Sequence, residues 1–216
     1  MNGEIDKTNQ IIELLKEANN IAVVPSKVAG VDAFAAGVGL YFMLKDLNKN
    51  VTVVYPGAKP EEFTDLTDVN IASNVNQREL VVSVDYSGTE ASKVHYSTEN
   101  DILYLTVSPV SKDFDLSKVK SEIKGHNFDL IITIGAQILD DFGQTFRELE
   151  GEFSKADILN LDNTERNQRF GTINIVDSNQ DSLSLLVLSK ALKWDLRLDS
   201  KAAEALLKGI SRRKGI

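Results

Sequence analysis

The stretch from residue 31 to residue 47 constrains the fold most, because it has the pattern of a helix that is apolar nearly all round. Such a helix is normally packed on several sides. It lies between two short apolar runs, 21–24 and 51–55, which have the character of buried parallel strands. The three segments predict a strand–helix–strand unit with a right-handed crossover. Three small residues of the helix favour close approach to a sheet: Ala36, Gly37 and Gly39.

The same alternation returns in the second half of the chain. We expect strands at 129–135, 158–161 and 173–176, and helices at 5–18, 139–150, 182–194 and 200–210. Alternating strands and helices predict an α/β fold with a mainly parallel sheet flanked by helices. We therefore expect residues 1–216 to form a single α/β domain.

The middle of the chain has a different character. Strand patterns at 80–85, 93–96 and 102–107 are separated by polar turns, and residues 97–101 are typical of a hairpin connection. We interpret this stretch as an antiparallel β insertion at about 80–127.

Composition excludes several kinds of chemistry. The chain has no cysteine, which rules out disulfides, zinc–thiolate sites and thiol nucleophiles. Its net charge of −8 makes binding of a long nucleic acid unfavourable. The basic cluster at 212–214 is typical of a solvated helix end. No basic leader or long apolar run is present, so we expect a cytoplasmic protein without a membrane partner.

A segment near residue 160 carries the most specific motif. The apolar run 158–161 ends in Asp162, Asn163 and Thr164, and continues with Asn167, Phe170, Gly171 and Asp177. With the final helical pattern at 202–210, this segment resembles the DHH phosphoesterases. That family includes RecJ-type exonucleases, oligoribonucleases of the nanoRNase type and cyclic-dinucleotide phosphodiesterases. The resemblance runs from about residue 21 to 210 and implies an α/β domain that holds two manganese ions at strand ends.

The resemblance also implies a set of metal ligands, and the first two motifs have lost most of theirs. The histidine of the first motif falls on Ser26 and its first aspartate falls on Gly30. Only its second aspartate survives, as Asp32. The strand-end aspartate of the second motif falls on Gly135.

The third motif, an aspartate followed by two histidines, keeps only the aspartate. It stands at Asp162, and the histidines fall on Asn163 and Thr164. A last motif falls near Arg213, where a cation would repel a metal. Two hard divalent ions need several anionic or imidazole ligands. The remaining pair of aspartates is too few, so we expect no cofactor, and a manganese site only if other ligands are recruited.

The two surviving aspartates also have structural interpretations. Asp32 either belongs to a relic ligand site or caps the start of its own helix, and the cap is the preferred interpretation. Asp162 is either a relic ligand or part of a strand-end turn, and both alternatives stay open. Lys27 beside Gly30, together with Asn167, is a possible contact for an anion or small nucleotide.

The favoured functional hypothesis is a catalytically inactive DHH-like protein that serves in binding or assembly, with a protein partner or a second copy of itself. One alternative is a divergent manganese-dependent phosphoesterase acting on short oligonucleotides or cyclic dinucleotides. It would have to recruit ligands such as Asp85 or Asp177, since His95 and His126 lie outside all the motifs. A third hypothesis is a nucleotide sensor that does not hydrolyse its ligand. Active family members continue into an accessory C-terminal domain, which we do not expect in this chain.

Overall fold

The computed structural model describes residues 2–55, 58–73, 79–87, 93–110, 112, 114–125 and 127–213. Contacts divide the chain into two compact units. One combines Met1–Asn76 with His126–Ile216, and the other is Gln77–Gly125.

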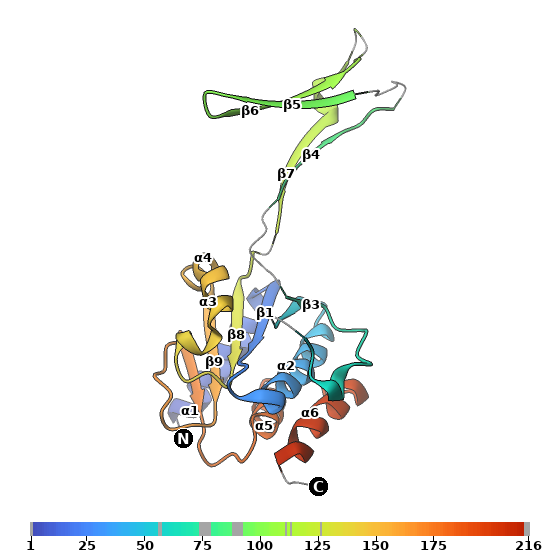
Figure 1. Cartoon of the computed structure of the whole chain (residues 1–216). Helices are drawn as coiled ribbons and strands as arrows, with labels where there is room; N and C mark the ends of the chain where they lie inside the picture. The colour runs from blue at the N-terminus through green and yellow to red at the C-terminus, as the bar shows by residue number, and fades with distance from the viewer. Residues whose placement is uncertain are drawn as a thin grey trace. The chain divides into compact units, whose positions relative to one another are not determined.

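The first unit is built on a six-stranded sheet in which all neighbouring strands are parallel (Figure 1). The order is β10-β9-β8-β1-β2-β3. The strands are β1 (Asn20–Pro25), β2 (Asn50–Val54), β3 (Ile71–Ala72), β8 (Leu130–Ile134), β9 (Asp157–Asp162) and β10 (Ile173–Val176). This confirms the predicted parallel α/β sheet; only the two-residue β3 was not predicted. Because the chain adds strands first on one side of β1 and later on the other, the strand order reverses between β1 and β8.

Helices cover both faces of the sheet, and the side chains of β1 alternate between the two cores. Ile21 and Val23 belong to one core, and Ala22 and Val24 belong to the other. The first core is closed by α1 (Asn2–Glu17), α2 (Gly30–Lys45), α5 (Leu183–Lys193) and α6 (Ser200–Arg213), together with the short η1 (Glu61–Phe63). The second is closed by η3 (Leu139–Phe142), α3 (Gln144–Glu148) and α4 (Glu150–Phe153).

Helix α2 is buried around most of its circumference, as its composition predicts, because it contacts the sheet, α5 and α6. Two glycines in the middle of α2 allow close packing against different neighbours. A Cβ at Gly37 would lie 3.2 Å from Pro25, so this glycine faces the sheet as expected. A Cβ at Gly39 would lie 2.5 Å from Leu206 Cγ, so this glycine faces α6 instead. Despite the apolar α2, no helix among the described residues has the length and apolarity needed to span a membrane.

The helix expected at 139–150 is divided into three short pieces. Gly143 separates η3 from α3 with φ 53° and ψ −120°, a conformation that suits glycine. Leu149 then ends α3 and precedes α4. The apolar periodicity is kept through the break, since Phe142, Leu149 and Phe153 all enter the second core.

The second unit contains two antiparallel strand pairs, which confirms the antiparallel β insertion. β4 (Glu79–Val84) pairs with β7 (Val119–Lys124), and β5 (Lys93–Glu99) pairs with β6 (Ile102–Ser108). A short η2 (Leu116–Lys118) precedes β7. The hairpin turn is tighter than predicted. It consists of Asn100 and Asp101, both at positive φ, which is the conformation of a two-residue hairpin loop.

Candidate functional site

A cavity of about 460 Å³ opens at the carboxyl edge of the sheet, beside the point where the strand order reverses. Ligands of open α/β sheets bind at this place. The cavity is lined by Val28, Ala29, Val31, Asp32, Gly135, Gln137, Asp162, Asn163, Thr164 and Leu183. The structure therefore brings together five of the predicted site residues: Asp32, Gly135, Asp162, Asn163 and Thr164.

Asp32 uses its carboxylate to cap a helix other than its own. One oxygen accepts a hydrogen bond from the backbone N–H of Leu183 at 2.7 Å. The other accepts from Ser184, through its backbone N–H at 3.1 Å and its hydroxyl at 2.7 Å. These groups lie in the first turn of α5, where N–H groups lack partners within the helix. The expected cap of α2 is wrong, because that helix has Ala29 at its N-cap and no side-chain cap.

Helix α6 packs tightly behind this carboxylate. A Cβ at Gly209 would overlap the Ser184 hydroxyl and lie 2.8 Å from both Asp32 Oδ1 and the Cβ of Ala35. A glycine is therefore required for α6 to approach α2 and α5 this closely. Packing against the Asp32 cap therefore accounts for the glycine of the final helical pattern.

Asp162 is 2% exposed and accepts hydrogen bonds on both carboxylate oxygens. Oδ1 accepts from the backbone N–H of Asn163 at 2.8 Å. Oδ2 accepts from the Thr164 hydroxyl and, at 2.9 Å, from the side-chain amide of Asn167. Within the part of the chain that the structure describes, every buried side-chain nitrogen and oxygen has a hydrogen-bond partner. The carboxylate is thus the centre of a satisfied polar network.

Asn167 connects this carboxylate to the interior of the sheet. Its side-chain N–H groups donate to Asp162 and to the carbonyl of Ala136, the latter at 2.7 Å. Its side-chain oxygen accepts from Asn160 at 2.9 Å and from the backbone N–H of Arg169 at 2.7 Å. Both amide protons and both acceptor positions are occupied. Asn167 therefore acts as a structural cross-link, and it does not line the cavity.

Gly135, the position on which the second-motif aspartate is expected to fall, is enclosed by neighbouring side chains. Gly135 has φ +74°, in the left-handed region that favours glycine. A Cβ there would lie 2.6 Å from Leu183 Cδ1 and 2.7 Å from the Cβ of Ala29. The volume that a carboxylate would need is filled by apolar atoms. Gly30, by contrast, has φ +69° and open space where its Cβ would be.

Two other predicted residues of the first motif do not line the cavity. Ser26 is fully buried, and its hydroxyl accepts a hydrogen bond from the backbone N–H of Val28 at 3.2 Å. The Lys27 ammonium lies 5.5 Å from the centre of the Tyr55 ring. Burial raises the pKa of Tyr55 above its ordinary value. Lys27 is therefore placed by a cation–π contact.

The aspartates that a recruited metal site would need are engaged elsewhere. Asp177 pairs with Lys190 at 3.5 Å. Asp85 lies in the insertion, where hydrogen bonds from Ser87 hold the pKa of its carboxyl below the ordinary value. His126 and the side chain of Arg213 lie outside the described residues.

The side chains that line the cavity are not a suitable set of ligands for two manganese ions. Two carboxylates line the cavity, and each already accepts at least three hydrogen bonds from the protein. Over the described ranges, no group of three or more histidine, aspartate or glutamate side chains is placed to hold a metal. No reaction step through such ions follows from this geometry.

The fold is a parallel α/β sheet flanked by helices, with the candidate site at the carboxyl edge of the sheet. Among solved structures, the chain is similar to an exopolyphosphatase-related protein from Bacteroides fragilis, with a TM-score of 0.64 and 15% sequence identity. The match covers 97% of this chain and 50% of that chain, so this chain spans half the length of that structure. At this identity the likeness shows a common fold. No protein-family model matches the chain, and no curated protein matches it.

Proposed function

We propose that this chain is a catalytically inactive relative of the DHH phosphoesterases that serves as a binding or assembly module. The catalytic inactivity is supported by one observation: both cavity carboxylates already accept hydrogen bonds from the protein's own N–H and O–H groups. A carboxylate that binds a metal ion must direct lone pairs at the ion. The protein's own hydrogen bonds therefore occupy only some of its acceptor positions. Here the carboxylate oxygens of Asp32 hold the start of α5, and those of Asp162 hold the turn that follows β9.

The lining also argues against the sensor hypothesis. The described side chains around the cavity include Asp32 and Asp162 and no lysine or arginine. A phosphorylated ligand entering without a metal would meet two negative charges and no compensating cation. A small nucleotide is therefore disfavoured as the occupant of this cavity.

The binding half of the proposal is supported by the β5–β6 hairpin. Residues directly opposite in an antiparallel pair share a face of the sheet. Tyr96 lies opposite Leu105, and Val94 lies opposite Val107, so these four side chains share one face. Tyr96 is 80% exposed, and Val94 and Leu105 are also exposed. An isolated two-stranded hairpin is marginally stable in water, and covering this face would stabilise it.

The proposed catalytic inactivity is tested by measuring metal content and hydrolysis. The purified chain, equilibrated with manganese and then freed of unbound ions, is analysed for bound metal and assayed with a linear dinucleotide, a cyclic dinucleotide and inorganic polyphosphate. We expect substoichiometric manganese and no turnover above that of the isosteric Asp162→Asn variant, with an active manganese phosphoesterase as positive control. Stoichiometric manganese with turnover that Asp162→Asn abolishes would overturn the inactive assignment.

The assembly half is tested by sedimentation velocity over a range of protein concentrations. A second copy is the simplest occupant of the apolar face, because twofold symmetry brings the same face of both copies together. We expect the Tyr96→Glu/Leu105→Lys variant to weaken self-association by about tenfold or more. His95→Glu/Thr106→Lys makes the same charge changes at a paired position on the opposite face and is the matched control. Monomeric wild-type protein at every concentration would contradict self-association.

A further inference from the structure

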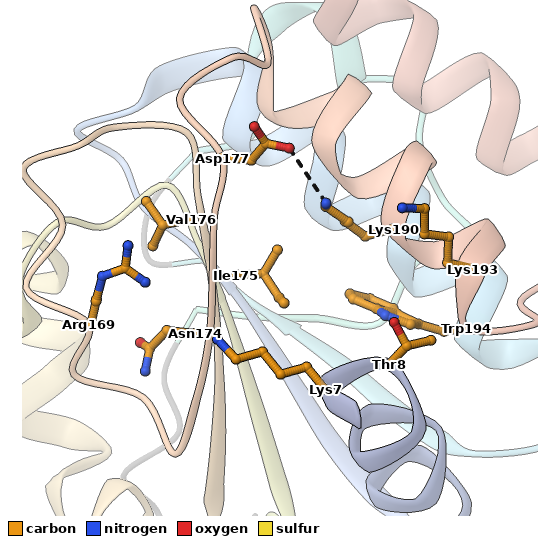
Figure 2. A pocket seen from close by; sticks show the side chains of 10 residues that line it. All are labelled: Lys7, Thr8, Arg169, Asn174, Ile175, Val176, Asp177, Lys190, Lys193 and Trp194. Carbon is orange, nitrogen blue, oxygen red and sulfur yellow. Dashed lines mark ion pairs between the residues drawn. The ribbon is translucent and has the colours of Figure 1, made fainter. Parts of the chain in front are cut away.

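The edge strands of this chain differ in how well they are protected from pairing with another chain. The six-stranded sheet ends in two short strands, β3 with two residues and β10 with four. Beside β10 lies a cavity of about 390 Å³, lined in part by Lys7, by Arg169 and by the ion pair of Lys190 with Asp177 (Figure 2). Short length and charged side chains are two features by which natural edge strands avoid pairing. Both edges of this sheet therefore have features that oppose the addition of a strand.

The β5–β6 hairpin has longer and more exposed edges. Each of its strands has seven residues, and every residue of β5 is exposed. Within the described residues, β6 is the only strand that pairs with β5. An exposed edge strand of this length is a template for pairing with another chain.

The hairpin turn determines which backbone groups of β5 point toward this open edge. The loop has two residues, so the flanking Glu99 and Ile102 form a hydrogen-bonded pair. Hydrogen-bonded and non-hydrogen-bonded pairs alternate along an antiparallel ladder. The backbone N–H and C=O groups of Val94, Tyr96 and Thr98 therefore point away from β6. Each of these residues offers one donor and one acceptor to a further strand.

The sequence of β5 is self-complementary when two copies of the strand run antiparallel about Tyr96. Lys93 of each copy then lies opposite Glu99 of the other, and Val94 lies opposite Thr98. Opposite charges at directly opposite positions stabilise an antiparallel pair. The lysine and the glutamate meet at a non-hydrogen-bonded position, where side chains are closest. Within its own hairpin neither residue has a charged residue opposite it on β6.

We propose that two copies of this chain associate through β5, which pairs antiparallel with β5 of the second copy about a twofold axis at Tyr96 and joins the two hairpins into one four-stranded sheet. This inference rests on the self-association proposed above and specifies its edge, register and charges. The apolar faces of the two hairpins become continuous, because opposite residues in an antiparallel pair share a face. The larger sheet has the number of strands that an isolated hairpin lacks for stability in water.

Other arrangements of two hairpins fit less well. The edge of β6, from Ile102 to Ser108, has no charged residue, so no charge complementarity selects a register there. Pairing of β5 with β6 of another copy is heterologous, and it leads to an open filament unless the rotation closes a ring. Stacking of the two apolar faces makes no use of the charges of Lys93 and Glu99.

The absence of cysteine from the chain allows the register to be tested by disulfide trapping. Val94→Cys and Thr98→Cys chains, one of them tagged so that the sizes differ, are mixed, oxidised and resolved on a non-reducing gel. In the proposed register these two positions face each other at a Cα–Cα distance of about 5.5 Å, which a disulfide can span. Two cysteines at the same position are about 14 Å apart. We therefore expect a mixed disulfide and neither homodisulfide.

The same experiment separates the alternative arrangements. Stacked sheets lie about 10 Å apart, which is too far for a disulfide between any of these positions. Parallel pairing in register would link each variant to itself and give no preference for the mixed product.

The charges are tested by sedimentation velocity. Lys93→Glu places like charges opposite each other at both ends of the ladder, and we expect it to weaken self-association about tenfold. The exchange Lys93→Glu/Glu99→Lys puts opposite charges back at the same positions and should restore the wild-type association. Lys120→Glu makes the same charge change at an exposed position of β7 and is the matched control.

The outcomes distinguish strand pairing from self-association in general. Self-association without the mixed disulfide, or with unchanged strength in Lys93→Glu, would overturn pairing through β5 and leave the proposed self-association standing. Monomeric wild-type protein at every concentration would overturn both, and it would leave the proposed catalytic inactivity unaffected.

Discussion

Replacing Asp162 by alanine is expected to lower the free energy of unfolding by about 3 kcal/mol, because it leaves several buried donors without an acceptor. The Asn163 N–H, the Thr164 hydroxyl and the Asn167 amide all donate to this carboxylate. Urea denaturation measures the loss. Asp140→Ala removes an exposed aspartate and should change stability by less than about 0.5 kcal/mol.

The sign of this effect distinguishes a scaffold from a metal site. Carboxylates gathered to hold metal ions repel each other when the ions are removed, so truncating one of them relieves repulsion and stabilises the metal-free protein. In this chain we expect the opposite sign, both for Asp162→Ala and, with a cost nearer to about 2 kcal/mol, for the helix-capping Asp32→Ala. An increase in stability for either variant, measured with a metal chelator present, would contradict the scaffold role.

Placing an aspartate at the second-motif position by Gly135→Asp is expected to destabilise the protein by about 3 to 5 kcal/mol and to create no metal site. The left-handed backbone contributes part of the cost, and the overlap of the new Cβ with Leu183 and Ala29 contributes the rest. Thermal and urea denaturation measure the loss, and metal analysis after equilibration with manganese tests for a site.

Gly30→Asp is the matched control for this experiment. It places an aspartate at another motif position with nearly the same φ, +69° against +74°, but the new Cβ has no atom within 4 Å apart from its chain neighbours and its own helix backbone. We expect it to cost about 1 kcal/mol, since aspartate tolerates the left-handed region better than most residues. Equal costs for the two variants would show that the packing around Gly135 yields easily, and manganese bound by Gly135→Asp would contradict the closed site.

The sheet and its helices were predictable because their signals are local. The run 21–24 is apolar at every position, and the helix that follows it is apolar on every side, so burial of both follows from composition. Strand β7, the partner of β4, is not predicted because Val119–Lys124 contains only two apolar residues, and Ser121 interrupts the alternation that would indicate a strand. The single helix predicted at 139–150 is interrupted at Gly143, although its apolar residues keep a helical spacing. Apolar spacing alone does not reveal such an interruption of the backbone.

The residues that gather at the candidate site were predictable, but their roles were not. Strand ends locate Gly135 and Asp162, since the carboxyl ends of parallel strands meet at one edge. The partners of Asp32 lie 151 and 152 positions away, so no spacing in the sequence connects this side chain to the start of α5. The network around Asn167 likewise depends on which face of β9 Asn160 occupies.

The central place of β1 and α2 has a consequence for synthesis on the ribosome. β1 is synthesised more than 100 residues before its neighbour β8, and α2 is made well before α5 and α6, which cover it in the folded protein. Until then the side of α2 that α5 and α6 cover in the folded protein stays exposed, which is the condition under which nascent chains aggregate or recruit chaperones. A chain truncated before residue 200 lacks α6 and therefore cannot cover the side of α2 that this helix buries.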